Sequence, residues 1–294
     1  MVAVTELGYI GIGIEDELAW VEYATKVVGM ELRDEGEADR FYLRLDTWHH
    51  RIAVHRNAGD DLLYAGWRVS GRSEFEAMAQ QLEGAGIEFR IGTEEEEFER
   101  HVLGLLKMTD PGGIATEVFY GPEIDYKRPF HPGRPMHGRF VTGDQGLGHC
   151  ILREPDTEAA YQFYRILGMT GGVEYKRRKP DGSVSRLTFM HCNDRQHSVA
   201  FGVPLSEKRI NHLMIEYTHL DDMGVAYDLM RDRQTPIAIG LGVHSNDKAL
   251  TYYAANPSGW LWEIGARGEP APKHHEYYVN DIFGHRKETA GYGL

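Results

Sequence analysis

The sequence predicts an α+β protein in which four copies of a strand–helix–strands unit are paired into two similar halves. One observation is that the stretch from Leu7 to Leu32 aligns with the stretch from Leu147 to Gly172. Each passes from a short apolar strand through an acidic turn into a helical pattern that ends in Gly-Met. Another is that "TDPGGIATEVFYGP" in the first half resembles "ANPSGWLWEIGARGEP" in the second. Two copies of such patterns indicate a duplicated domain.

The first half opens with an apolar strand, and a helical pattern follows it. Gly29 closes this helix, where glycine suits a left-handed C-terminal cap. A strand-like stretch runs from Asp39 to Asp46, and a second strand–helix unit runs from Leu62 to Ile87. The run of glutamates after Thr93, from Glu94 to Glu97, predicts a capped, solvated helix start. Apolar residues recur at helical spacing on the first helix: Leu18, Trp20, Val21, Tyr23 and Val27.

The second half repeats this order. A strand-like stretch runs from His197 to Val203, and a second strand–helix unit runs from Ile210 to Ile237. The stretch from Gly121 to Phe140 is rich in Pro, Gly and basic residues and shows no periodicity, which predicts a boundary. We therefore expect an N-terminal domain at 1–135 and a C-terminal domain at 136–294. The apolar face of the first helix in this half is Ala160, Phe163, Tyr164 and Leu167.

Length and composition narrow the class of protein. The chain has 294 residues, which fits two domains of ordinary size. Its net charge of −13 argues against binding to nucleic acid and to anionic membranes. It shows no apolar run long enough to span a bilayer and no secretory signal, and Cys150 and Cys192 are too few for a disulfide scaffold. We expect a cytoplasmic protein with reduced cysteines.

Three residues that can bind a metal lie at related positions of the second half. His149 lies on the first strand of the third unit, and His212 lies on the first strand of the fourth. Glu263 lies on the last strand of that unit. Two imidazoles and a carboxylate can form a facial triad, which leaves positions open on a non-haem Fe(II) ion. From spacing alone a structural role stays open, because a lone histidine on a strand is more often structural.

The matching positions of the first half carry different chemistry. They read Tyr9, Tyr64 and Glu117, so the glutamate is kept and both imidazoles are replaced. Tyrosine has a pKa of about 10 and is a poor Fe(II) ligand at neutral pH. We expect the first half to keep the fold and to bind no metal.

The ordered motifs "GLGHC", "FMHCNDRQHS", "NHLMIE", "GLGVHSNDKALTYYAANPSGWLWEIG" and a late "FGH" resemble the type I extradiol dioxygenases of the vicinal oxygen chelate superfamily. The likeness covers nearly the whole chain. It is strongest to the 2,3-dihydroxybiphenyl 1,2-dioxygenase and 1,2-dihydroxynaphthalene dioxygenase group. The resemblance implies two domains, each of two βαβββ modules in the glyoxalase-like fold. It also implies Fe(II), with Mn(II) less favoured, on His149, His212 and Glu263 of the second domain alone.

The resemblance also implies roles around the metal. His197 matches the acid/base histidine, although this chain has Gln196-His197 where many relatives have His-His. His244 matches the histidine that hydrogen-bonds the substrate oxygen, and Tyr253 matches the tyrosine next to the bound hydroxyl. Tyr252 competes for that tyrosine role. Two further matches complete the substrate site: Asp247 as a supporting carboxylate and Phe189 as an aromatic wall. From the residues alone, "GVHSNDK" also reads as a plain Asx-type turn.

The implied function is extradiol (meta) cleavage of a catechol with O₂, in aromatic catabolism. The favoured substrate is a bicyclic or aryl-substituted catechol such as 2,3-dihydroxybiphenyl or 1,2-dihydroxynaphthalene. Alternatives are a monocyclic diol such as 2,3-dihydroxy-p-cumate, a non-oxygenase metalloenzyme of the same superfamily, and a metal-free protein that binds an aromatic compound. A homo-oligomer is expected from the family, and the tail from His274 to Leu294 is a candidate cover for the site. Structural or surface roles are expected for His191, His219, His274 and His275.

Overall fold

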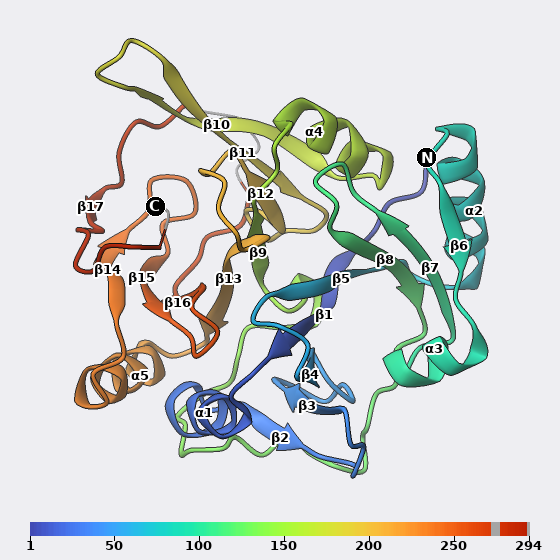
Figure 1. Cartoon of the computed structure of the whole chain (residues 1–294), viewed down its shortest axis with the longest axis horizontal. Helices are drawn as coiled ribbons and strands as arrows, with labels where there is room; N and C mark the ends of the chain where they lie inside the picture. The colour runs from blue at the N-terminus through green and yellow to red at the C-terminus, as the bar shows by residue number, and fades with distance from the viewer. Residues whose placement is uncertain (272–276, 293–294) are drawn as a thin grey trace.

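The computed structural model describes residues 1–271 and 277–292, so His274 and His275 lie outside the described residues. The first half consists of two successive units in which a strand and a helix are followed by three strands (Figure 1). Its elements are β1 (Glu6–Ile14), α1 (Glu17–Glu22), η1 (Tyr23–Val28), β2 (Glu31–Arg33), β3 (Arg40–Arg44), β4 (Ile52–Arg56), β5 (Leu62–Arg68), α2 (Arg72–Gly84), β6 (Phe89–Ile91), α3 (Glu94–Arg100), β7 (Gly104–Thr109) and β8 (Ala115–Tyr120).

The second half repeats the two units and adds a short strand near the end of the chain. Its elements are η2 (Gly143–Gln145), β9 (His149–Leu152), α4 (Thr157–Ile166), β10 (Thr170–Arg178), β11 (Val184–His191), β12 (Val199–Phe201), β13 (Ile210–Tyr217), α5 (Leu220–Asp232), β14 (Ile237–Val243), β15 (Leu250–Ala255), β16 (Leu261–Ala266) and β17 (Phe283–Gly284). The α+β class and the four βαβββ units are confirmed. The division at residues 135 and 136 stays a prediction.

Each half forms one curved sheet, and the two sheets have the same strand order. The first runs β2-β3-β4-β1-β5-β8-β7-β6, and the second runs β10-β11-β12-β9-β13-β16-β15-β14-β17. In β13, Met214 pairs with both His149 and Glu263, and in β5 a single residue pairs with both Tyr9 and Glu117. The sheets therefore confirm the equivalences predicted between the halves: Tyr9 with His149, Tyr64 with His212 and Glu117 with Glu263.

The first helix departs from the predicted pattern. After α1 the chain continues as the π-helix η1, so the spacing of side chains changes part-way along. Trp20 and Tyr23 are buried, but Leu18 is 84% exposed, so its assignment to the apolar face was wrong. The predicted caps are confirmed: Gly29 has φ +96°, and Thr93 caps α3 in a capping box.

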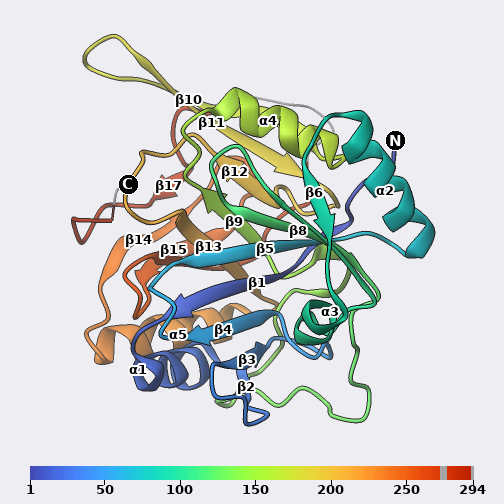
Figure 2. The ribbon, with the colours of Figure 1, turned by 45° about the vertical axis from the view of Figure 1, so that its right-hand side comes forward.

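The halves meet through equivalent turns. In the β7–β8 turn, Asp110 accepts a hydrogen bond from the Tyr164 hydroxyl of α4 at 3.1 Å. In the β15–β16 turn, the Ser258 hydroxyl accepts from the Trp20 indole at 2.8 Å and donates to Asp60 at 2.6 Å. Helix α5 packs against η1 on the same side of the molecule (Figure 2). No helix in the described part of the chain combines the length and apolarity needed to cross a membrane.

A segment near the end of the chain joins the two margins of the second sheet. On one side β17 pairs with β14, with Gly284 opposite Gly242. On the other side the Tyr278 amide donates to the Glu174 carbonyl at 2.7 Å, and the Lys176 amide donates to the Tyr278 carbonyl at 3.0 Å. The segment thus links β14 to β10 across the open side of the sheet. Among the described residues, no strand joins β2 to β6 in this way.

Candidate active site

Three strands of the second sheet bring His149, His212 and Glu263 together. Nε2 of His149 lies 3.0 Å from Oε2 of Glu263, and Nε2 of His212 lies 3.1 Å from the same oxygen. One ligand atom from each residue lies within 4.8 Å of the other two. All three side chains are buried. Two imidazoles and a carboxylate in this arrangement could hold one metal ion.

The charges of these groups also suit a cation. Burial lowers the pKa of His149 to about 4, although Glu263 opposes the shift, so its imidazole is neutral at pH 7 and keeps a lone pair for a metal. Burial alone would raise the pKa of Glu263, but contacts with His149 and His212 hold that pKa well below its ordinary value. The Nδ1–H of His212 faces the Asn211 side-chain oxygen at 2.7 Å, which leaves Nε2 for the site.

His197 lies directly beside this cluster. Its ring centroid is 3.7 Å from that of His149, and Phe189 meets it edge-on at 4.7 Å. Nδ1 of His197 donates to the Gln196 side-chain oxygen at 2.6 Å, and the Gln196 amide donates to the Glu174 carboxylate at 2.7 and 2.8 Å. Gln196 therefore fixes which nitrogen of His197 carries the proton. Burial lowers the pKa of His197, which keeps this imidazole neutral.

His244 and Tyr253 lie on the opposite side of the glutamate. Nε2 of His244 lies 3.0 Å from Oε1 of Glu263, and the Tyr253 hydroxyl lies 2.8 Å from the same nitrogen. The Tyr253 ring also meets the His212 ring edge-on, with centroids 5.0 Å apart. Tyr252 lies on the other face of β15 and packs against Tyr227. The structure thus brings Tyr253 to the cluster and leaves its competitor in the core.

Asp247 lies close to His244 in sequence but is turned toward its own loop. Its carboxylate accepts the Ala249 amide at 2.9 Å, which is an Asx-type turn. Burial raises the pKa of Asp247, and His244 opposes that shift. No direct hydrogen bond from Asp247 to His244 is formed.

Sequence reasoning missed a second carboxylate that contacts His244 besides Glu263. Nδ1 of His244 donates to Oδ1 of Asp281 at 2.9 Å, and Nδ1 of His285 lies 3.0 Å from Oδ2 of Asp281. The Thr251 hydroxyl completes this group at 3.0 Å from Nε2 of His285. The motif "FGH" ends at His285, so an acidic residue four positions before a tail histidine was the available signal.

The equivalent cluster of the first half is closed by an arginine. The Tyr9 hydroxyl donates to Glu117 at 2.8 Å, and the Arg100 guanidinium donates to both carboxylate oxygens of Glu117 at 3.1 Å each. The Arg100 guanidinium also lies 3.8 Å from the centroid of the Tyr64 ring. Burial raises the pKa of Tyr9 and of Tyr64, so both phenols stay neutral. A side-chain cation therefore neutralises the retained glutamate.

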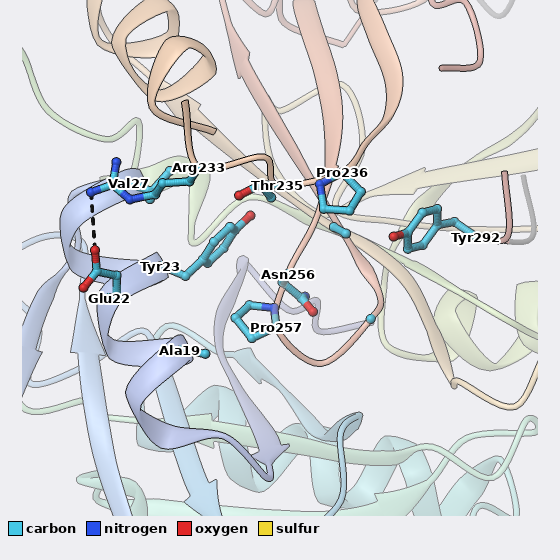
Figure 3. A pocket seen from close by; sticks show the side chains of 12 residues that line it. Ala19, Glu22, Tyr23, Val27, Arg233, Thr235, Pro236, Asn256, Pro257 and Tyr292 are labelled. Carbon is cyan, nitrogen blue, oxygen red and sulfur yellow. Dashed lines mark hydrogen bonds and ion pairs between the residues drawn. The ribbon is translucent and has the colours of Figure 1, made fainter. Parts of the chain in front are cut away.

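The pocket shown in Figure 3 is a different feature. It has a volume of about 400 Å³ and lies between the first helix and the β15–β16 turn. Glu22 and Arg233 form an ion pair at its rim, and Tyr23 and Asn256 contribute to its walls (Figure 3). None of the histidines described above lines it.

Comparisons with known proteins agree with this geometry. Residues 146–264 match the Glyoxalase/Bleomycin resistance protein/Dioxygenase superfamily, and residues 7–56 match the first domain of dihydroxybiphenyl dioxygenase. A biphenyl-2,3-diol 1,2-dioxygenase of Sphingomonas paucimobilis is 58% identical over 294 residues, covering 100% of this chain and 98% of that protein. The chain belongs to the extradiol dioxygenase family of the vicinal oxygen chelate superfamily.

Further relatives of this dioxygenase cover it equally well. A 1,2-dihydroxynaphthalene dioxygenase of Sphingobium xenophagum is 58% identical over 100% of the chain and 99% of the relative. A crystal structure described as catechol 2,3-dioxygenase is 57% identical, with a TM-score of 0.99 over 100% of this chain and 98% of the other. The described part of this dioxygenase therefore shares its fold with a protein that is itself named as a dioxygenase.

Proposed function

We propose that this dioxygenase opens the ring of a catechol beside its diol, with Fe(II) held by His149, His212 and Glu263. The observation that supports this proposal is the convergence of these three buried groups, with a carboxylate that is ionised and a His149 imidazole that is neutral. When bound, the ion would supply a Lewis acid for the diol and a redox partner for O₂. Mn(II) accepts the same ligands and is the less favoured metal.

The side chains around the triad would then divide the remaining work. Nε2 of His197 would first accept a proton from a substrate hydroxyl and later deliver it, because Gln196 holds the Nδ1–H. Nε2 of His244 and the Tyr253 hydroxyl, which lie 2.8 Å apart, would orient the substrate oxygens and stabilise charge on them. Phe189 would form an aromatic wall beside His197, and Asp247 would support the loop that carries His244.

The substrate follows from the relatives as a proposal. The two most similar curated relatives described above are named for biphenyl-2,3-diol and for 1,2-dihydroxynaphthalene, which favours a bicyclic or aryl-substituted catechol. A monocyclic catechol is the second candidate, because a similar solved structure is described as catechol 2,3-dioxygenase. A 3-methylcatechol 2,3-dioxygenase of Pseudomonas putida is also 34% identical over 97% of the chain.

The location, the oligomeric state, the partners and the domain bounds of the enzyme belong to the same proposal. We place the enzyme in the cytoplasm, in aromatic catabolism, as a homo-oligomer that binds neither nucleic acid nor membranes. The net charge of −13 supports the last two points. We also propose a metal-free domain at 1–135 and a catalytic domain at 136–294. The alternatives of a non-oxygenase metalloenzyme and a metal-free binding protein are set aside by membership of the dioxygenase family.

The test is oxygen uptake by protein purified without O₂ and reconstituted with Fe(II). A panel of 2,3-dihydroxybiphenyl, 1,2-dihydroxynaphthalene and monocyclic catechols would rank the substrates by kcat/KM. We expect His197→Ala to keep its iron and to lose about 10²- to 10⁴-fold in kcat, the range for loss of a general acid–base group. The control is His137→Ala, whose side chain is 67% exposed. Iron-loaded wild type that consumes no O₂ with any catechol would refute the proposed function.

A further inference from the structure

We propose that the tail segment Tyr277–His285 is part of the active site and that its Asp281 is the positioning residue for His244. The inference rests on the proposed function and adds to it a residue far from the metal ligands in sequence. It concerns how the imidazole of His244 is held. It gives the tail a positioning role in the site, in contrast to a tail that only covers the site.

The segment is fixed to the sheet on both sides of Asp281. After it, the Ile282 amide donates to the Val243 carbonyl at 2.8 Å, and β17 continues the pairing along β14 (Figure 1). Before it, the Ser245 hydroxyl donates to the Asn280 carbonyl at 2.7 Å. These contacts place Asp281 beside the residue that follows β14, which is His244. The placement of Asp281 is therefore dictated by backbone pairing.

The Asp281 carboxylate receives contacts from three side chains. His244 Nδ1 and the Tyr175 hydroxyl both donate to Oδ1, at 2.9 and 3.2 Å. His285 Nδ1 lies 3.0 Å from Oδ2. Burial raises the pKa of Asp281, but His244 and His285 lower it by more, so the group stays ionised at neutral pH. An ionised carboxylate is an acceptor only, so each neighbour must present a hydrogen to it.

This requirement fixes the orientation of the His244 ring. Because Nδ1–H donates to Asp281, the ring is held with Nε2 on the side of the metal ligands. Nε2 is the atom that faces Glu263 and Tyr253, at 3.0 and 2.8 Å. A substrate oxygen arriving there would meet an imidazole nitrogen already aligned with the site. A carboxylate that holds an imidazole from behind plays the same part in catalytic triads.

The neighbouring carboxylate cannot take this part in the described geometry. Asp247 accepts the Ala249 amide within its own loop. Behind Asp281, by contrast, the Thr251 hydroxyl lies 3.0 Å from Nε2 of His285. The network thus extends from β15 through the tail to His244, and Asp281 is its central acceptor.

The test compares Asp281→Ala with Glu288→Ala in the iron-loaded enzyme. Glu288 is a tail carboxylate that pairs with Arg231 at the surface at 3.3 Å and lies away from His244. We expect Asp281→Ala to lose about 10- to 100-fold in kcat, the effect of removing an outer partner of a site histidine. We also expect it to bind 4-nitrocatechol more weakly without O₂, with a changed absorption spectrum, at wild-type iron content. Glu288→Ala should match wild type in all these measurements.

Asp281→Asn provides a second variant of nearly unchanged volume. Its amide oxygen can accept from only one of the two imidazoles, so we expect values between those of wild type and Asp281→Ala. Wild-type kcat, KM and anaerobic affinity in both Asp281 variants would overturn the inference while leaving the proposed function intact. Loss of iron in parallel with activity would also overturn it, because the residue would then be structural. Inactivity of wild type itself would refute the proposed function instead.

Discussion

The two halves of the molecule surround equivalent buried glutamates with different partners. In the second half, Glu263 faces two imidazoles whose free nitrogens can share a metal ion. In the first half, Glu117 faces two neutral phenols and the guanidinium of Arg100. The strand register around both glutamates is the same. Arg100 supplies a positive charge beside Glu117, and in the proposed function a metal ion would supply it beside Glu263.

The largest expected effect comes from Glu263→Gln. The amide removes the charge that attracts a cation, so we expect metal content and kcat to fall by more than about 100-fold, beyond the usual loss for an outer partner. Metal analysis and O₂ uptake with a catechol would measure both. Full metal content in this variant would remove Glu263 from the ligand set.

The same change in the first half should act on stability alone. Glu117→Gln removes the bidentate partner of the buried Arg100, which keeps only its ion pair with Glu99, and breaking a buried pair costs about 3–5 kcal/mol of unfolding free energy. Turnover per folded molecule should stay near that of wild type, because the proposed catalytic metal site lies in the other half. Urea denaturation would measure the loss of stability, and O₂ uptake would measure the turnover.

A double variant sharpens this comparison. Arg100→Met together with Glu117→Gln replaces the charged pair by groups that need no counterion, so most of the lost stability should return. If the double variant is no more stable than Glu117→Gln, the Arg100–Glu117 pair is not the reason for the loss.

A smaller expected effect is on the pH dependence of stability, and it arises at only one of the two turns through which the halves meet. The β7–β8 turn places Asp110 against Glu154, whereas the equivalent β15–β16 turn uses the neutral Ser258 hydroxyl. Burial, and then the contact with Asp110, raises the pKa of Glu154 to about 9. Between the ordinary pKa and this value the folded state holds a proton that the unfolded state has lost. Stability should therefore fall as pH rises through this window.

Glu154→Gln is the corresponding experiment. Its amide can donate to Asp110 at any pH, so the contribution of Glu154 to the slope should disappear. From about pH 6.5 to about pH 8, the unfolding free energy of wild type should fall by up to about 2 kcal/mol more than that of Glu154→Gln. This corresponds to about 1.4 kcal/mol per pH unit. Chemical denaturation at these two pH values would measure it, and parallel slopes would contradict the assignment.

Much of the fold could be predicted because the repeat carries it. The aligned openings placed His149 and Tyr9 on equivalent strands, and the register confirms this alignment. Leu18 was misplaced because it lies in α1 itself, about 200° around the helix from the buried Trp20 at 3.6 residues per turn. Strand β12, at Val199–Phe201, is shorter than the predicted stretch from His197 to Val203.

The sequence predicts the three candidate metal ligands but not the residues that contact them from the tail and from α3, and the reason is physical. His149, His212 and Glu263 lie on strands whose positions follow from the repeat, so their convergence followed from symmetry. Asp281 and Arg100 have no such constraint, because one lies in the added tail and the other at the end of a helix. Their contacts depend on tertiary pairing over long sequence separations, and no local pattern encodes that pairing.

The arginine in the first half occupies the place where a metal ion would have to lie beside Glu117. A change of Tyr9 or Tyr64 to histidine would set an imidazole beside the fixed guanidinium, which repels any incoming cation. A change of Arg100 alone would leave the buried carboxylate of Glu117 with the Tyr9 hydroxyl at 2.8 Å and the Lys107 ammonium at 3.6 Å. A metal site like that of the second half would therefore need several changes in the first half at once: two imidazoles in place of the phenols, and no guanidinium between them and the glutamate.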